Sequence, residues 1–318
     1  MDFLNLNKDE RSAVFLRGSE LTGRSPRLLE KDFWVCWVLE RLFTAGGLPE
    51  LTFKGGTSLS KAYGVIDRFS EDIDITVDRK ALGFREEYPS QSKREKALEA
   101  LDQELRRVAR EEILPLFEGL EISQLRAELA GEIVIIYYPT VLDAPTGYLV
   151  DTVRVELGGR NPTEPSELRE LLVDLAEYFP DIRFPHPRVR VLSAVRTFWE
   201  KATILHSYHS ANEAIGHRKS RHYYDLVKLA RHELGAQALA DIGMLETVAQ
   251  DKNLLFRSGK ARYDLARPGT LRLVPSEAQL ASLREDYSQM QVMFYEVPPT
   301  FDDLVTELRR LETLINVQ

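Results

Sequence analysis

The feature that most constrains the fold is a six-residue stretch in which polar and apolar side chains alternate strictly. The stretch reads Asp72, Ile73, Asp74, Ile75, Thr76, Val77. A period of two is typical of a β-strand, because successive side chains of a strand point to opposite faces. The sequence therefore predicts a half-buried strand at 72–77 with two carboxylates on its polar face.

A pair of glycines lies shortly before this strand. Gly55 and Gly56 follow a predicted strand at 51–54 and precede a predicted short helix at 57–63. Glycines at such a junction let backbone amides approach an anion, and the start of a helix adds positive potential. Thr57 and Ser58 add hydroxyl donors. These four residues are candidate phosphate contacts, although the same four residue types also form simple turns.

The two carboxylates suit a divalent cation. Asp72 and Asp74 share one strand face, where two negative charges repel unless a cation offsets them. Mg²⁺ binds few protein carboxylates and completes its shell with substrate phosphates and water. A phosphate loop beside metal-binding carboxylates predicts phosphoryl or nucleotidyl transfer, with Mg²⁺ as the metal and Mn²⁺ as an alternative. A merely solvated strand face is the competing explanation of the pair.

A third carboxylate is predicted on a later strand. Arg154 and Glu156 alternate with apolar residues within 148–157, which we expect to form a hairpin with a strand at 132–138. If the later strand lies beside residues 72–77, Glu156 completes a carboxylate triad and polarises the attacking hydroxyl or shares a second metal. A cross-strand salt bridge explains Arg154 and Glu156 equally well.

The overall pattern is α+β. Two helical patterns cover the first 46 residues, with Ser25-Pro26 as a helix start, and a charged amphipathic helix is predicted at 87–114. Residues 159–165 read as a linker, and helices are then predicted at 166–179, 193–210, 219–234, 236–250, 276–290 and 300–317. We expect a sheet-containing domain at 1–158 and a helical domain at 159–318.

Two segments together resemble a known family. Gly-Gly-Thr-Ser-Leu-Ser-Lys at 55–61 and Arg-Phe-Ser-Glu-Asp-Ile-Asp-Ile at 68–75 are similar to the AbiEii/AbiGii toxin family of nucleotidyltransferases. They match the polymerase-beta superfamily signature more loosely, since fourteen residues separate Thr57 from Asp72. The family also has a lysine after an aromatic-Glu pair and a later aspartate, here Lys201 and Asp225. The resemblance spans roughly residues 30–235.

The resemblance implies a fold, a site and a role. The fold would be a nucleotidyltransferase-type mixed sheet with flanking helices, followed by a helical C-terminal domain, with the active site between them. Asp72 and Asp74 would hold Mg²⁺, and Lys201 would reach the phosphates of the NTP while Asp225 fixes Lys201 or the nucleotide. The predicted nucleotide contacts are Gly55, Gly56, Thr57, Ser58, Lys61 and Ser70. Such proteins act as the toxin of a toxin–antitoxin or phage-defence pair, some on the 3′ end of tRNA, so a cognate antitoxin is expected.

Alternatives remain at this stage. Residue spacing alone favours Lys201 and Asp225 as exposed helix charges, since Arg221 and Lys228 lie one turn from Asp225. The acceptor is an RNA, or else a protein hydroxyl or small molecule, and a third hypothesis is a nucleotide-binding protein without catalysis. The segment 217–222 is the strongest local basic patch in a chain with a formal net charge of −8.

Composition and targeting signals favour a cytoplasmic protein without a membrane span. The start of the chain has no secretory pattern, and a single cysteine, Cys36, cannot form an internal disulfide. Five of the six histidines lie between His206 and His232, but their spacing matches no zinc motif.

Overall fold

The alternating stretch forms β2 (Asp72–Val77), the central strand of a mixed sheet. Within the described part of the chain, seven strands pair in the order β3 (Arg126–Ala130), β4 (Ile133–Tyr137), β5 (Thr152–Gly158), β2, β1 (Leu51–Lys54), β7 (Arg188–Leu192) and β6 (Ser166–Glu170). β2 runs parallel to β5 and antiparallel to β1, and β1 runs parallel to β7. β3, β4 and β5 form an antiparallel meander.

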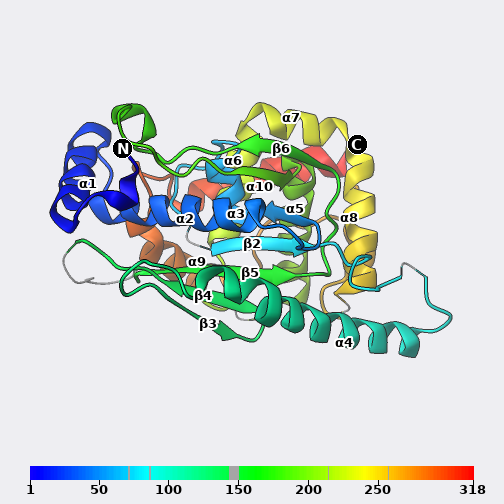
Figure 1. Cartoon of the computed structure of the whole chain (residues 1–318). Coiled ribbons are helices and arrows are strands. Elements are labelled where there is room, and N and C mark those ends of the chain that lie inside the picture. Colours follow the sequence, from blue (N-terminus) through cyan, green and yellow to red (C-terminus); the bar gives the residue numbers. More distant parts are fainter. Residues whose placement is uncertain (71, 86, 143–149, 214, 257) are drawn as a thin grey trace. The chain divides into compact units, whose positions relative to one another are not determined.

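The structure is a computed structural model that describes residues 1–70, 72–85, 87–142, 150–213, 215–256 and 258–318 (Figure 1). The chain divides into two compact units. Unit 1 comprises Met1–Ala62 and Phe69–Val191, and unit 2 comprises Tyr63–Arg68 and Leu192–Gln318. The units differ from the predicted domains, 1–158 and 159–318, because β6 and β7 extend the sheet of unit 1 and because a short earlier segment belongs to unit 2.

The helices of unit 1 are α1 (Lys8–Thr22), α2 (Pro26–Thr44), α3 (Gly55–Lys61) and α4 (Gln91–Val108). α2 begins as predicted, with Ser25 as the N-cap and Pro26 in the first turn. It packs against β5, and α3 packs against β1 and β2. Figure 1 shows α2 and α3 lying across the sheet at β2. The expectation of a half-buried strand was wrong, because the polar side of β2 is also largely covered: Thr76 is fully buried, Asp72 is 8% exposed and only Asp74 is partly exposed.

Unit 2 is helical, as predicted for the later part of the chain. It contains α5 (Ala194–Ala211), α6 (Arg221–Arg231), α7 (Glu233–Ala240), α8 (Ile242–Leu255), α9 (Glu277–Gln289) and α10 (Phe301–Asn316). α5 is its core helix and packs against α6, α7 and α8. The early segment 63–68 is fastened to this unit, since the amide of Tyr295 donates to the carbonyl of Asp67 at 3.1 Å.

The predicted helix at 166–179 was wrong. Residues 166–170 form β6, and only a short 3₁₀ turn, Ala176–Tyr178, is helical. Leu171, Val173 and Leu175 are buried whereas Leu172 is 56% exposed, so the apolar residues alternate with the period of an extended chain. The predicted helix at 87–114 begins later than expected, at Gln91, and α4 ends at Val108, after which a π turn, Ala109–Ile113, and a 3₁₀ turn, Leu114–Phe117, continue the helical path.

The predicted hairpin is confirmed by the antiparallel pairing of β4 with β5, in which Tyr137 lies opposite Thr152. We expected residues 139–147 to connect the two strands of the hairpin. Residues 143–147 of this connection and the predicted strand start at 148 lie outside the described residues. Among the helices that the structure describes, none is both long enough and apolar enough to cross a membrane.

Candidate functional site

Asp72, Asp74 and Glu156 come together on neighbouring parallel strands. In the register of β2 and β5, Asp72 lies opposite Arg154, and Asp74 lies opposite Glu156. Both pairs project on the same face of the sheet because residues two apart in a strand share a face. The adjacency on which the predicted triad depends is therefore present in the structure.

One guanidinium lies among the three carboxylates. The Nε atom of Arg154 is 3.7 Å from Oδ1 of Asp72, and its Nη2 atom donates to Oε1 of Glu156 at 3.3 Å. Burial, together with the charges of Asp72 and Asp74, raises the pKa of Glu156 above its ordinary value, although Arg154 opposes the shift. The predicted salt bridge of Arg154 with Glu156 is therefore present, and Arg154 also lies close to Asp72. The role of Glu156 as a third catalytic carboxylate stays a prediction.

The donor set fits a divalent cation that is shared with a substrate. Asp72 and Asp74 offer two carboxylates on one strand face, and Mg²⁺ takes its remaining ligands from phosphate oxygens and water. Within the described residues, no group of three or more His, Cys, Asp or Glu side chains is placed to hold a metal ion together. The fit to a divalent cation therefore rests on the two carboxylates Asp72 and Asp74.

Gly55 places the backbone directly against Asp74. Its φ is +81°, in the left-handed region that favours glycine. A Cβ atom added to Gly55 would lie 1.9 Å from Oδ2 of Asp74. Only glycine fits at this position without moving the carboxylate. The predicted requirement for glycine is thus explained by the approach to Asp74.

The hydroxyl groups of Thr57 and Ser58 donate to backbone carbonyls. The Oγ1 atom of Thr57 donates to the carbonyl of Asp72 at 2.5 Å, and Oγ of Ser58 donates to the carbonyl of Gly55 at 2.9 Å. Both side chains are buried, and Ser70 is 6% exposed. Thr57 therefore ties α3 to the first residue of β2. The phosphate contacts predicted for Gly56, Thr57, Ser58 and Ser70 stay predictions.

Lys61 lies in a buried ion cluster. Its Nζ atom is 2.6 Å from Oδ1 of Asp32 and 2.7 Å from Oδ1 of Asp174. Burial raises the pKa of Asp32 to about 6, although the Lys61 ammonium opposes the shift. The ammonium thus anchors the end of α3 to α2 and to the segment that contains Asp174. Its predicted contact with a nucleotide stays a prediction, and any such contact would compete with two carboxylates.

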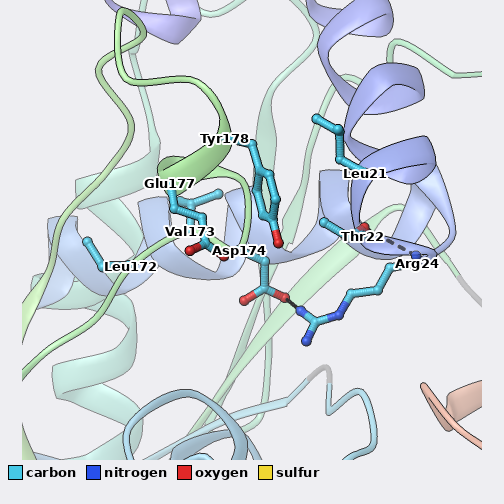
Figure 2. A pocket seen from close by; sticks show the side chains of 8 residues that line it. All are labelled: Leu21, Thr22, Arg24, Leu172, Val173, Asp174, Glu177 and Tyr178. Carbon is cyan, nitrogen blue, oxygen red and sulfur yellow. Dashed lines mark hydrogen bonds and ion pairs between the residues drawn. The ribbon is translucent and has the colours of Figure 1, made fainter.

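The same cluster reaches a cavity of about 410 Å³. Figure 2 shows Asp174 in its wall, paired with Arg24, which follows the C-terminal end of α1. The aromatic ring of Tyr178 lies above this ion pair in the view. The cavity is lined by Leu21, Thr22, Arg24, Leu172, Val173, Asp174, Glu177 and Tyr178. None of these eight residues was predicted to belong to the site.

In unit 2, Lys201 and Asp225 form a buried ion pair. Nζ of Lys201 lies 2.7 Å from Oδ2 of Asp225, and the two side chains are 7% and 0% exposed. The alternative of exposed helix charges is therefore wrong. Asp225 does not pair with its helix neighbours, because its side chain projects from α6 into the packing with α5.

A second cation completes this cluster. Nε of Arg68 donates to Oδ1 of Asp225 at 2.7 Å, and Nη2 donates to Oδ2 at 2.8 Å. Although burial acts in the opposite direction, Arg68 and Lys201 hold the pKa of Asp225 well below its ordinary value. Burial lowers the pKa of Lys201, and Arg68 adds to this effect while Asp225 opposes it. Sequence reasoning assigned no role to Arg68, since nothing in the sequence indicates that this charge is buried.

Two histidines of unit 2, His206 and His209, bind backbone atoms. Nδ1 of His206 accepts from the amide of Arg272 at 3.0 Å, so its Nε2 carries the proton and donates to the carbonyl of Arg262 at 2.9 Å. His209 contacts the carbonyl of Val274 at 2.8 Å.

Comparison with known proteins identifies a matching family. The family model described as "Nucleotidyl transferase AbiEii toxin, Type IV TA system" matches residues 37–307. Among solved structures, the chain is similar to MenT4, a nucleotidyltransferase toxin from Mycobacterium tuberculosis H37Rv. The identity is 17%, the TM-score is 0.47, and the alignment covers 98% of this chain and 99% of that chain. No match was found among the curated proteins.

Proposed function

Because the chain belongs to the AbiEii family of nucleotidyltransferase toxins of type IV toxin–antitoxin systems, we propose that it transfers a nucleotide from an NTP to an RNA acceptor. The preferred acceptor is the 3′ end of tRNA. The observation that carries the proposal is the parallel register that sets Asp74 beside Glu156, with Asp72 on the same face. A cognate antitoxin is part of the proposal.

In the proposed reaction, a hydroxyl oxygen of the acceptor attacks the α-phosphorus of the NTP. A new oxygen–phosphorus bond forms, the bond from the α-phosphorus to the bridging oxygen breaks, and pyrophosphate leaves. Mg²⁺ held by Asp72 and Asp74, or Mn²⁺ in its place, would neutralise phosphate charge. Glu156 accepts the proton of the attacking hydroxyl, a role that suits a carboxylate whose pKa is raised by burial and by its acidic neighbours.

The backbone of the Gly55–Lys61 helix and Ser70 are the proposed contacts of the triphosphate, and Gly55 keeps the chain close to Asp74. Lys201 is the proposed phosphate-binding cation of unit 2. Its ammonium has Asp225 as its one hydrogen-bond partner in the described part of the chain, which leaves two N–H donors for anionic oxygens. Asp225 holds the lysine side chain in place.

The test is a labelling experiment. The protein is incubated with Mg²⁺ and each labelled NTP in turn, with total RNA and cell protein present. Label on RNA supports the proposal, and label on tRNA supports the preferred acceptor. Label on protein or on a small molecule would redirect the proposal to those acceptors. NTP binding without any labelled product would indicate a nucleotide-binding protein without catalysis.

A further inference from the structure

A second cavity of unit 1 lies where β2 and β5 end, and its residues carry no assigned role. The turn 78–80, which follows β2, and the segment 161–164, which follows β5, line a volume of about 280 Å³. We propose that this cavity is a binding site for a phosphate group, with Arg79 as the side chain that holds it. Every residue of the lining belongs to unit 1, and the inference does not depend on the proposed function.

The cavity lies at the carboxyl ends of two parallel strands. β2 and β5 run side by side, and Thr76 opposite Gly158 is the last pair of their register. Asp78 continues the sheet beyond β2, since its amide donates to the carbonyl of Glu50 at 3.0 Å. In open α/β sheets, ligands bind in the crevice outside the carboxyl ends of parallel strands. The pairing of β2 with β5 therefore places the cavity where such sheets bind their ligands.

The side chain of Arg79 is the observation that points to a ligand. Its Nε and Nη1 atoms are buried and have no hydrogen-bond partner among the residues that the structure describes. A buried donor without an acceptor is costly in free energy, and the cost is larger for a charged group. A guanidinium also matches the oxygens of a phosphate group in geometry and charge. A phosphate in the cavity would supply the acceptors that Arg79 lacks.

The two acids in the lining are bound by other groups. Oδ1 of Asp78 accepts from the amide of Lys80 at 3.1 Å. The carboxylate of Glu164 accepts from the amide and from the hydroxyl of Ser166, at 2.8 and 2.9 Å. Neither carboxylate accepts a hydrogen bond from Nε or Nη1 of Arg79. The wall of the cavity thus contains carboxylates, but they do not occupy these two donors.

The size and the lining of the cavity indicate the class of ligand. A volume of about 280 Å³ lies just below the usual range of sites for drug-sized molecules, which favours a phosphate group over a whole cofactor. Thr163 brings a hydroxyl group to the wall, and a hydroxyl can donate to a phosphate oxygen beside the guanidinium. Two sources carry this chemistry, namely free inorganic phosphate and the phosphodiester backbone of an RNA.

The experiment measures binding to the full chain in buffer that contains EDTA, so that a metal on the carboxylate face does not contribute. Sodium phosphate is titrated by calorimetry at constant ionic strength, and tRNA is titrated by fluorescence anisotropy at several salt concentrations. Arg79→Gln removes the charge that is proposed to hold the phosphate. Arg160→Gln is the matched control, because Arg160 directly precedes the segment 161–164 and its guanidinium is already paired with Asp102.

We expect Arg79→Gln to bind its phosphate ligand about tenfold more weakly than the wild type, and Arg160→Gln to match the wild type. Weaker binding of inorganic phosphate alone assigns the site to free phosphate. Weaker binding of tRNA, with a salt dependence that is lower by about one phosphate contact, assigns it to the RNA backbone. Without phosphate, Arg79→Gln should melt no lower than the wild type, because Nε and Nη1 of Arg79 give up no hydrogen bond.

Two results would overturn the inference. The first is equal affinity of Arg79→Gln and the wild type for both inorganic phosphate and tRNA, or no binding of either by the wild type. The second is an equal loss in Arg160→Gln, which would show a general effect of positive charge. If Arg79→Gln does not fold, Arg79→Lys decides, because weaker binding at an unchanged melting temperature supports the site and unchanged binding contradicts it. The labelling experiment tests nucleotide transfer separately, so the two claims can fail independently.

Discussion

Asp74 on β2 lies opposite Glu156 on β5 in a parallel register. The two residues are far apart in the sequence, and each shares its strand face with one further charged residue, Asp72 or Arg154. The pairing places Asp72, Asp74 and Glu156 on one sheet face, where Arg154 contacts Asp72 and Glu156. Neighbouring carboxylates on a sheet face are the ligands that a metal-dependent phosphate-transfer site needs.

Asp72→Asn and Asp74→Asn should each abolish transfer, with a loss on the order of 10²-fold or more, because each removes an anionic metal ligand. Neither should unfold the protein, since asparagine preserves the shape of the side chain. Asp78→Asn is the matched control, because Asp78 directly follows β2 and its side chain accepts from the amide of Lys80. Near-normal transfer in Asp72→Asn or Asp74→Asn at saturating Mg²⁺ would refute the metal assignment.

Glu156→Gln should raise the melting temperature at pH 7. The pKa of Glu156 is raised in the folded state, so the folded protein holds this proton more tightly than the unfolded chain does. The charged form therefore opposes folding at neutral pH, and stability increases as the pH falls through the folded pKa toward 4.5. In melts between pH 4 and 8, the difference in melting temperature between Glu156→Gln and the wild type should shrink as the pH falls through the folded pKa.

Mg²⁺ provides a check on the preceding prediction. Added Mg²⁺ should raise the melting temperature of the wild type at pH 7, because it offsets the repulsion among the acids. The effect should be smaller in Asp74→Asn. A melting temperature that is equally insensitive to Mg²⁺ in both proteins would contradict binding at this face.

Gly55→Ala should impair both stability and transfer. The new Cβ atom would meet a carboxylate oxygen of Asp74, and the residue would keep a positive φ. Gly83→Ala is the matched control, since Gly83 has a φ of +80° and no atom within 4 Å of an added Cβ. Backbone strain should cost each variant about 1–2 kcal/mol in urea unfolding. Only Gly55→Ala should also lose transfer, and equal activity in the two variants would argue against the contact with Asp74.

Asp225→Ala and Lys201→Ala should differ sharply in stability. Asp225→Ala leaves two buried cations without their shared partner, which should cost roughly 3–5 kcal/mol. Lys201→Ala leaves Asp225 bound by both donors of Arg68, so its loss in free energy of unfolding should be clearly smaller. Equal urea midpoints for the two variants would show that Arg68 does not hold Asp225 as described.

The sequence predicted the carboxylate face well because it follows from strand periodicity. Asp72, Asp74 and Glu156 sit on alternating stretches, and only the pairing of the two strands needed confirmation. The early helices and most helices of unit 2 were predicted from a different period, since their apolar residues recur at helical spacing. Strands β6 and β7 were missed because they are short and because the charged residues of 166–170 lack strict alternation.

Burial of charge could not be predicted in this way. Lys61, Arg68, Lys201 and Asp225 are residue types that normally lie in solvent, and each is buried through a partner far away in the sequence. Asp225, for example, pairs with a residue 157 positions earlier in the chain. Local spacing points instead to Arg221 and Lys228, so a surface ladder was the natural but wrong alternative.

The most direct test of nucleotide transfer compares two positions of the label. The protein is incubated with Mg²⁺, tRNA and each NTP labelled at the α-phosphate, and in parallel with the same NTP labelled at the γ-phosphate. Transfer of a nucleotide places the α label on tRNA and releases the γ label as pyrophosphate, and Asp74→Asn should give neither product. Transfer of the γ label to the acceptor, or α labelling that persists in Asp74→Asn, would contradict the account.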